Sequence, residues 1–123
     1  GLHYAIDYRN KDWYEELMDL TDGQGVELIT DPLGGKEWKR SYKALRATGR
    51  LGMFGISSAS EGTSGGISAM WSMLKTVVQM PFYHPLPLIG KNRGVFGVNL
   101  GHLWHEPKKA KVWMQEILQG VED

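Results

Sequence analysis

The sequence predicts an α/β fold with a parallel sheet, and three observations in its first half support this. Within residues 25–35, an apolar segment (Val26, Leu28, Ile29) is followed by Asp31-Pro32 and a glycine pair, which is typical of a strand that ends in a sharp turn. Trp38, Tyr42 and Leu45 then recur at helical spacing. A second apolar strand, residues 51–54, ends at Gly55. Strand, turn, helix and strand in this order indicate a βαβ unit.

The ends of these two strands are the first candidates for a binding site. In open α/β sheets, ligands bind beyond the carboxyl ends of the strands. That rule selects residues 31–34 and residues 54–58, which are rich in small and polar side chains.

The other elements of the first half follow from periodicity and capping residues. Residues 4–8 are predicted to form a short strand, and Asn10 or Asp12 is expected to cap the next helix. The buried stripe of that helix is predicted from apolar residues three and four apart: Trp13, Leu17 and Leu20. The helix after the first turn is expected to span residues 36–47 and to end at Thr48-Gly49.

The second half is predicted to hold a loop, two helices and one strand. Residues 57–66 are rich in Ser and Gly and are expected to form a surface loop. A strongly apolar helix follows, and then a connector that prolines break. Residues 93–99 are predicted to be a strand, and Glu106-Pro107 to open a final helix. The helical periodicity comes from Ile67, Met70, Trp71, Leu74, Val77 and Val78, and the connector prolines are Pro81, Pro85 and Pro87.

Composition restricts the classes of function. The 123 residues fit one domain, and the formal net charge of zero argues against a nucleic-acid or membrane-surface role. Arg40, Lys43 and Arg46 are interpreted as a solvated helix face. The absence of cysteine excludes disulfides and thiolate metal sites within this chain. No signal peptide or membrane span is evident, so we expect a cytoplasmic protein.

Three segments in order resemble a known family. They are Ala5-Ile-Asp-Tyr8, the stretch from Gly25 to Gly35, and the stretch from Gly49 to Gly55. Together they resemble the cofactor-binding half of medium-chain dehydrogenases/reductases, in the zinc-independent quinone oxidoreductase group. The segment from Gly97 to Gly101 looks most like the branch that contains the vesicle amine transport proteins.

The resemblance implies a partial Rossmann fold. The family has a six-stranded sheet in the order 3-2-1-4-5-6, and this chain would supply strands 3 to 6, with residues 4–8 as strand 3. Residues 1–123 would then be the C-terminal portion of an NAD(P)-binding Rossmann domain. The Gly-rich phosphate loop and the substrate domain have no counterpart in the chain, so we expect a fragment of a longer protein.

The resemblance also implies binding residues for NADPH. Tyr8 matches a position near the adenosine 2′-phosphate, and Arg9 is expected to pair with that phosphate; local packing of Tyr8 is the alternative. The remaining matches lie in three places: the turn after strand 4, the segment beside the nicotinamide ribose and pyrophosphate, and the strand that reaches the nicotinamide carboxamide. They are Asp31, Pro32, Leu33 and Gly34, then Phe54, Gly55, Ile56, Ser57 and Ser58, then Phe96, Gly97 and Val98.

Two alternatives stay open at the level of function. The first is part of an NADPH-dependent oxidoreductase that transfers hydride to a quinone or an activated enone or enal, as a homodimer through the strand from Val95 to Val98. The isolated chain is expected to be inactive, and no catalytic residue is assigned. The second is a non-catalytic α/β interaction or dimerisation module. His102 and His105 have helical spacing but are too few for a metal site, so no metal is expected.

Overall fold

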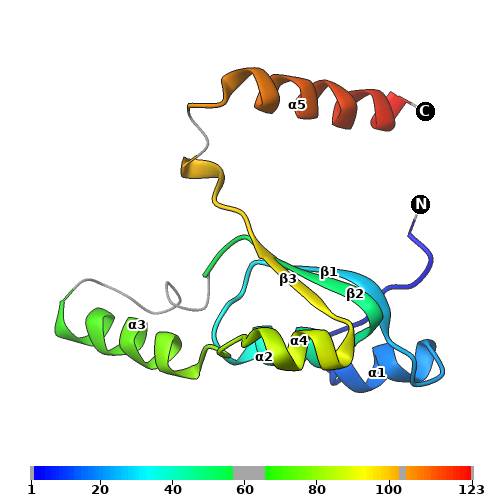
Figure 1. Cartoon of the computed structure of the whole chain (residues 1–123), viewed down its shortest axis with the longest axis vertical. Helices are drawn as coiled ribbons and strands as arrows, with labels where there is room; N and C mark the ends of the chain where they lie inside the picture. The colour runs from blue at the N-terminus through cyan, green and yellow to red at the C-terminus, as the bar shows by residue number, and fades with distance from the viewer. Residues whose placement is uncertain (1, 57–65, 103–104, 123) are drawn as a thin grey trace.

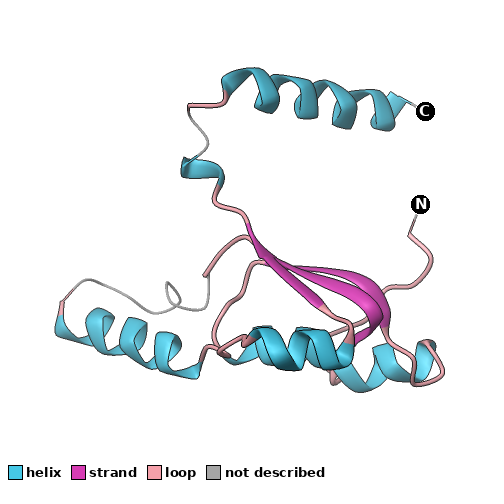
Figure 2. Cartoon of the chain, in the orientation of Figure 1, coloured by secondary structure: helices cyan, strands magenta, loops and turns pink. Residues whose placement is uncertain are grey.

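The structure is a computed structural model that describes residues 2–56, 66–102 and 105–122. The bounds of its helices and strands are α1 Trp13–Leu20, β1 Val26–Asp31, α2 Lys36–Lys43, β2 Leu45–Met53, α3 Ile67–Gln79, α4 Pro85–Lys91, β3 Gly94–Gly97, the 3-10 turn η2 Leu100–His102 and α5 Pro107–Glu122. Helices and strands alternate up to β2, after which α3 and α4 follow one another before β3, as Figure 2 shows. Of the loop predicted at residues 57–66, all but Gly66 lies outside the described residues.

The three strands form one parallel sheet in the order β1-β2-β3. Ile29 is opposite Leu51, and Leu51 is opposite Val95, so the three strands are in register across the centre of the sheet. Figure 1 shows α1, α2 and α4 on one side of the sheet. The predicted α/β class with a parallel sheet is confirmed.

The core lies where α2 covers the sheet. Ala44, Leu45 and Leu51 are its fully buried apolar residues among those described. Leu45 and Leu51 lie on β2, the central strand: Leu45 is opposite Val26 of β1, and Leu51 is opposite Ile29 of β1 and Val95 of β3. Removing apolar surface of this kind from water is the main driving force for folding.

The predicted helix over residues 36–47 is too long. The helix ends at Lys43, and Leu45 already pairs with Val26 in the sheet. The amide of Val26 donates to the carbonyl of Ala44 at 3.0 Å, and Leu45 is buried. Sheet pairing and burial therefore override helix propensity here. Arg46 consequently lies on β2 and not on the helix face to which it was assigned.

The predicted strand at residues 4–8 is not formed. Residues 2–7 have no regular structure, and Tyr8 begins a turn. A strand is stable only when its backbone groups pair with a neighbour, and the sheet order β1-β2-β3 includes no partner for this segment. The side chain of Asp7 instead holds the turn, accepting from the Arg9 amide at 3.2 Å and from Asn10 Nδ2 at 2.7 Å.

Helix α1 begins as predicted but buries less. Asp12, one of the two expected caps, accepts hydrogen bonds from the amides of Tyr14 and Glu15. Trp13 and Leu17 are half-buried, whereas Leu20 is 45% exposed, so the predicted buried stripe is wrong at its last member. Leu20 is the last residue of this short helix.

The proline-rich connector contains a helix that periodicity did not reveal. Helix α4 begins with Pro85, and the side chain of His84 accepts from the Leu86 amide at 3.3 Å. Just before it, the Tyr83 hydroxyl donates to the Trp38 carbonyl of α2 at 3.2 Å. Burial raises the pKa of the Tyr83 phenol, and Tyr42 and Asp31 raise it further. The connector thus packs on α2 and does not run free.

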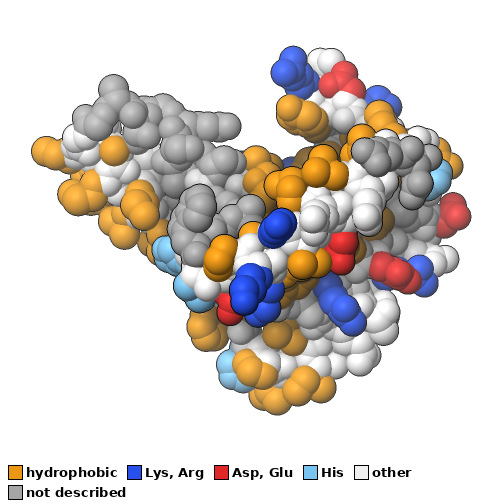
Figure 3. All heavy atoms as spheres, turned by 90° about the horizontal axis from the view of Figure 1, so that it is seen from above, with side chains coloured by type: hydrophobic (Ala, Val, Ile, Leu, Met, Phe, Trp, Pro, Cys, Tyr) orange, Lys and Arg blue, Asp and Glu red, His pale blue; other side chains and the backbone are white. Residues whose placement is uncertain are grey.

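Helices α3 and α5 form as predicted, but their apolar faces are open. They pack little against the sheet, and Figure 1 shows both lying apart from it. The large apolar residues of α3 are each at least half exposed. In Figure 3, α3 is the part of the molecule at the left, and hydrophobic side chains are gathered on it. The exposed apolar residues of α3 are Ile67, Met70, Trp71, Met73, Leu74, Val77 and Val78. The apolar residues at helical spacing, from which this helix was predicted, are therefore not buried against other described residues.

Candidate functional site

The loops that follow β1 and β2 touch each other at the carboxyl edge of the sheet. The Phe54 amide donates to the Asp31 carbonyl at 3.3 Å. A Cβ on Gly55 would lie 2.9 Å from the Pro32 carbonyl oxygen, and a Cβ on Gly34 would lie 3.0 Å from Ile56. Only glycine permits such an approach, and Gly34 also has a φ of +83°. The two candidate segments therefore form one continuous surface.

The side chain of Asp31 holds this surface in place. Its side chain is 5% exposed, and both carboxylate oxygens accept hydrogen bonds. The Leu33 amide donates at 2.7 Å, which fixes the turn, and the Ser41 hydroxyl donates at 2.6 Å from α2. An Asp side chain that accepts from the amide two residues on is a common way to stabilise a turn, and Asp31 does so here. The carboxylate holds the loop and the helix in a fixed relation.

A cavity of about 710 Å³ opens beside this anchor. Its walls come from the N-terminal segment, α1, the end of β1 and α2, and most of the lining is apolar. The lining residues are Ile6, Tyr8, Trp13, Leu17, Ile29, Thr30, Asp31, Pro32, Leu33, Glu37, Arg40 and Ser41. Tyr8 thus reaches the same cavity as Asp31, Pro32 and Leu33, although more than twenty residues separate them in sequence.

Other candidate residues are placed differently. Arg9 is exposed and does not line the cavity. The Phe96 ring covers Gly52 of β2, where a Cβ would lie 2.8 Å from the ring. Gly97 ends β3, and the Val98 amide donates to the Met53 carbonyl at 2.9 Å, so this segment adjoins the loop after β2. Ser57 and Ser58 lie outside the described residues.

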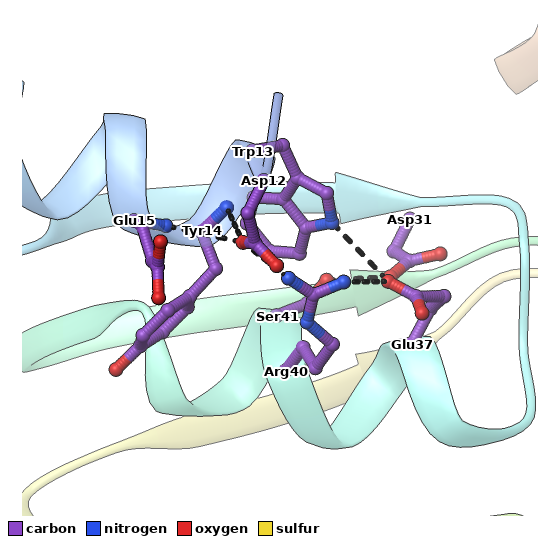
Figure 4. A network of polar contacts seen from close by, with 8 residues as sticks. All are labelled: Asp12, Trp13, Tyr14, Glu15, Asp31, Glu37, Arg40 and Ser41. Atoms are coloured by element: carbon purple, nitrogen blue, oxygen red, sulfur yellow. Dashed lines mark hydrogen bonds and ion pairs between the residues drawn. The ribbon is translucent and has the colours of Figure 1, made fainter. Parts of the chain in front are cut away.

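A polar cluster joins the two helices that wall the cavity, and Figure 4 shows it. Arg40 of α2 pairs with Asp12 at 2.5 Å and with Glu37 at 3.5 Å, and its guanidinium lies 5.0 Å from the centre of the Trp13 ring. Trp13 Nε1 donates to Glu37 Oε2 at 3.2 Å. The solvated-face interpretation of Arg40 is therefore wrong. The sequence did hold one indication that Arg40 is paired: Glu37 lies three residues before it on the same predicted helix, a spacing at which two side chains are neighbours.

The described residues offer no metal site and no membrane-spanning helix. They contain no group of three or more His, Cys, Asp or Glu side chains arranged to hold a metal ion. No helix among them combines the length and hydropathy that crossing a bilayer requires.

A parallel three-stranded sheet whose strand-end loops meet beside a cavity is the architecture of part of a nucleotide-binding α/β domain. The sequence model described as "Zinc-binding dehydrogenase" matches residues 1–116. The chain therefore belongs to this family, within the medium-chain dehydrogenase/reductase superfamily. Despite the family's name, the cysteine-free chain and its described residues do not fit a zinc site.

Two curated relatives show the range of the similarity. The synaptic vesicle membrane protein VAT-1 homolog of Danio rerio is 34% identical over 118 residues, which cover 96% of this chain and 24% of that protein. Quinone oxidoreductase 1 of Escherichia coli (strain K12) is 37% identical over 58 residues, which cover 47% of this chain and 18% of that protein. The chain thus spans about a quarter, or less, of the length of these two relatives.

Solved structures agree on the fold. The nucleotide-binding subdomain of the enoylreductase domain of PpsC from Mycobacterium tuberculosis aligns with a TM-score of 0.62 and 27% identity, covering 100% of this chain and 59% of that one. The Escherichia coli quinone oxidoreductase complexed with NADPH aligns with a TM-score of 0.52 and 25% identity, covering 80% of this chain and 24% of that one. The resemblance to the quinone oxidoreductase group is confirmed at the level of the family.

Proposed function

We propose that residues 1–123 are the C-terminal portion of the NAD(P)-binding Rossmann domain of an NADPH-dependent oxidoreductase. The whole protein would transfer hydride to a quinone or to an activated enone or enal. The name of the curated relative from Escherichia coli and the NADPH in the solved Escherichia coli quinone oxidoreductase support this choice of substrate class and cofactor. Reduced nicotinamide supplies the hydride when it is bound, and this chain supplies position and shape.

One observation carries the proposal: the loops after β1 and β2 form a single surface at the carboxyl edge of the sheet, beside a cavity that Tyr8 lines. The cavity has the size and the mostly apolar lining that are typical of small-molecule and cofactor sites, and Asp31 in its wall is fixed by two hydrogen bonds. Gly34 and Gly55 keep the backbone of both loops free of side chains. The surface therefore offers backbone groups and shape to a bound cofactor.

The residues proposed to hold NADPH come from four segments. They are Tyr8 and Arg9; Asp31, Pro32, Leu33 and Gly34; Phe54, Gly55, Ile56, Ser57 and Ser58; and Phe96, Gly97 and Val98. Tyr8 has the firmest support, because it lines the cavity together with residues 31–33. Arg9 has less support, because it lies off the cavity. The serine hydroxyls can donate to ribose or phosphate oxygens without adding charge.

The experiment is a titration of the whole protein with NADPH, followed by oxidation of NADPH in the presence of a water-soluble quinone or a conjugated enone. We expect saturable binding and substrate-dependent loss of reduced nicotinamide absorbance. We expect no turnover from the 123-residue chain alone, because a complete dinucleotide site also needs a Gly-rich phosphate loop. Turnover by this chain, or no NADPH binding by the whole protein, would contradict the proposal.

Tyr8→Phe in the whole protein tests the cofactor assignment at one atom. The substitution removes the phenol hydroxyl and keeps the ring, so NADPH affinity should fall while NADH affinity stays unchanged. Equal affinities for NADPH in both forms would remove Tyr8 from the site.

A second candidate function is self-association, and the open apolar face of α3 favours it. Exposed apolar patches of this extent commonly mark interaction sites. The outer edge of β3 is a further candidate for the dimer contact, since no described strand pairs with it. Light scattering over a concentration series tests this function, with Leu74→Glu for the α3 face. A monomer at high concentration would exclude it.

A further inference from the structure

The chain enters β3 through contacts made by Arg93, the residue just before the strand. The Arg93 amide donates to the Leu88 carbonyl of α4 at 3.0 Å. Its side chain reaches α2, where Nη1 donates to the Tyr42 carbonyl at 3.1 Å and the guanidinium carbon lies 5.4 Å from the centre of the Tyr42 ring. The neighbouring Asn92 carbonyl accepts from the Thr48 amide of β2 at 2.6 Å. Arg93 thus joins the start of β3 to two helices, which Figure 1 shows on one side of the sheet.

The chemistry of this contact suits arginine. Tyr42 lies in the last turn of α2, where the helix carries partial negative charge on its carbonyls. A guanidinium is planar and carries several donors, so it can donate to such a carbonyl and stack on the adjacent ring at the same time. A lysine ammonium could supply a donor but not the planar stacking. Arg93 is also half-buried, so water competes less for its side chain than at an exposed site.

The sequence of β3 specifies its register on β2 only weakly. The strand is four residues long and reads Gly94-Val-Phe-Gly97, and glycine-rich strands are prone to slip along their neighbours. One pairing within the strand resists slippage: Phe96 is opposite Gly52, where a Cβ would lie 2.8 Å from the ring. A shift by two residues would place the ring opposite Arg50 or Phe54, which carry side chains. The Arg93 contact adds a fixed point at the start of the strand.

The register of β3 decides which residues lie at the carboxyl edge of the sheet. Gly97 is opposite Met53, and the Val98 amide donates to the Met53 carbonyl at 2.9 Å, so this segment adjoins the loop after β2. Each residue of a strand advances the chain by about 3.3 Å, so a slip by one residue would displace Gly97 and Val98 by that distance. The same neighbours occur in a complete domain, because the Rossmann order 3-2-1-4-5-6 places its last three strands side by side.

We infer that Arg93 is a positioning residue that sets the register of β3 on β2, and through it the place of Gly97 and Val98 beside the loop after β2. This inference rests on the proposed function, which assigns residues 54–58 and 96–98 to NADPH, with the nicotinamide end expected there. Arg93 lies at the amino end of β3, whereas these residues lie at its carboxyl end, so it acts through the strand and does not touch the cofactor. Its effect is on the orientation of the nicotinamide and therefore on hydride transfer.

The test compares Arg93→Met with Lys91→Met in the whole protein. Both substitutions remove one positive charge near the start of β3, but Lys91 is exposed and is not part of the contact. We expect Arg93→Met to lower the single-turnover rate of NADPH oxidation about tenfold, while the Kd for NADPH changes less than about twofold, because a small misplacement at the reacting end costs rate more than binding. Lys91→Met should change neither. Arg93→Lys keeps a donor but not the stacking, so it should recover only part of the rate.

A measurement without cofactor keeps the inference distinct from the proposed function. Amide hydrogen exchange, followed by mass spectrometry, should become faster at residues 94–98 in Arg93→Met, because the pairing of β3 with β2 loosens. It should stay unchanged at residues 26–31 of β1, and at both places in Lys91→Met. Equal acceleration in β1 and β3 would mean a general loss of stability and would overturn the positioning role.

The remaining outcomes separate the inference from the proposed function. Unchanged exchange at residues 94–98 in Arg93→Met would overturn the inference even if NADPH binds as proposed. Parallel losses of NADPH affinity and of oxidation rate would also overturn it, because the effect would not be confined to the nicotinamide end. Absence of NADPH binding by the unmodified protein would contradict the proposed function and the effect on hydride transfer, and the exchange result would still decide the role in register. If Arg93→Met does not fold, Arg93→Lys carries both measurements, with the same signs and smaller changes.

Discussion

Ser41→Ala is the sharpest test of how the site is held together. The Ser41 hydroxyl donates to the Asp31 carboxylate at 2.6 Å, and Asp31 is 5% exposed. Hydrogen bonds to charged groups contribute about 1.5–3 kcal/mol, and water has little access to replace this one. The substitution should therefore lower the free energy of unfolding by about 2 kcal/mol. The cost arises because a buried carboxylate oxygen loses its donor.

The assay is urea unfolding followed by tryptophan fluorescence and circular dichroism. With an m value of about 2 kcal/mol/M, the loss corresponds to a midpoint about 1 M lower, with m unchanged. Ser68→Ala is the matched control, because Ser68 is an exposed serine on α3 and should change stability by less than about 0.5 kcal/mol.

Asp31→Asn tests the same contact from the carboxylate side. The Asp31 carboxylate accepts from two donors, Ser41 and the Leu33 amide, and an amide nitrogen cannot accept at either place. We expect a loss at least as large as that of Ser41→Ala. The reasoning is refuted if Ser41→Ala and Ser68→Ala have the same midpoint within error.

Three further predictions concern the loop contact, the core and pH. Gly55→Ala places a Cβ 2.9 Å from a backbone oxygen of Pro32 and should lower the free energy of unfolding, measured in urea, by about 1–3 kcal/mol. The control is Gly90→Ala on α4, where the added Cβ meets open space and the change should be neutral or stabilising. Equal effects of the two substitutions would exclude the close contact of the two loops. Leu51→Ala removes a fully buried side chain and should cost about 2–5 kcal/mol; a loss below about 1 kcal/mol would mean that β2 is not the core strand. The Glu15 amide first, and then the Tyr14 amide and Arg40, hold the pKa of Asp12 below its ordinary value of 3.8. Because the pKa of Asp12 is lower in the folded state than in the unfolded state, its contribution to stability is fully present above pH ~4 and is lost as pH falls through the folded pKa. In urea titrations from pH ~5 to ~3, the difference in unfolding free energy between the unmodified protein and Asp12→Asn should therefore shrink.

Much of the candidate site followed from the order of residues. The rule that ligands bind beyond the carboxyl ends of parallel strands selected residues 31–34 and 54–58. Of the second segment, residues 54–56 are described, and the contacts of Gly34 and Gly55 show that they adjoin the first segment. The rule could not predict the polar cluster in which Arg40 and Glu37 of α2 contact the start of α1. Its members come from helices separated by a strand, and their side chains meet only after both helices have packed. Periodicity reports which face of a helix is buried but not what it touches.

The sequence alone determined the fold class, the parallel sheet and most of the elements, because hydrophobic period, capping residues and glycine turns are local properties. The tertiary structure decided where these elements stop and which of them persist. Helix α2 ends at Lys43 because Leu45 is drawn into the sheet, and residues 4–8 form no strand because no neighbour pairs with them. The tertiary structure also decided that Tyr8 and Asp31 share one cavity. Contacts between distant segments depend on packing, and packing is a property of the whole chain.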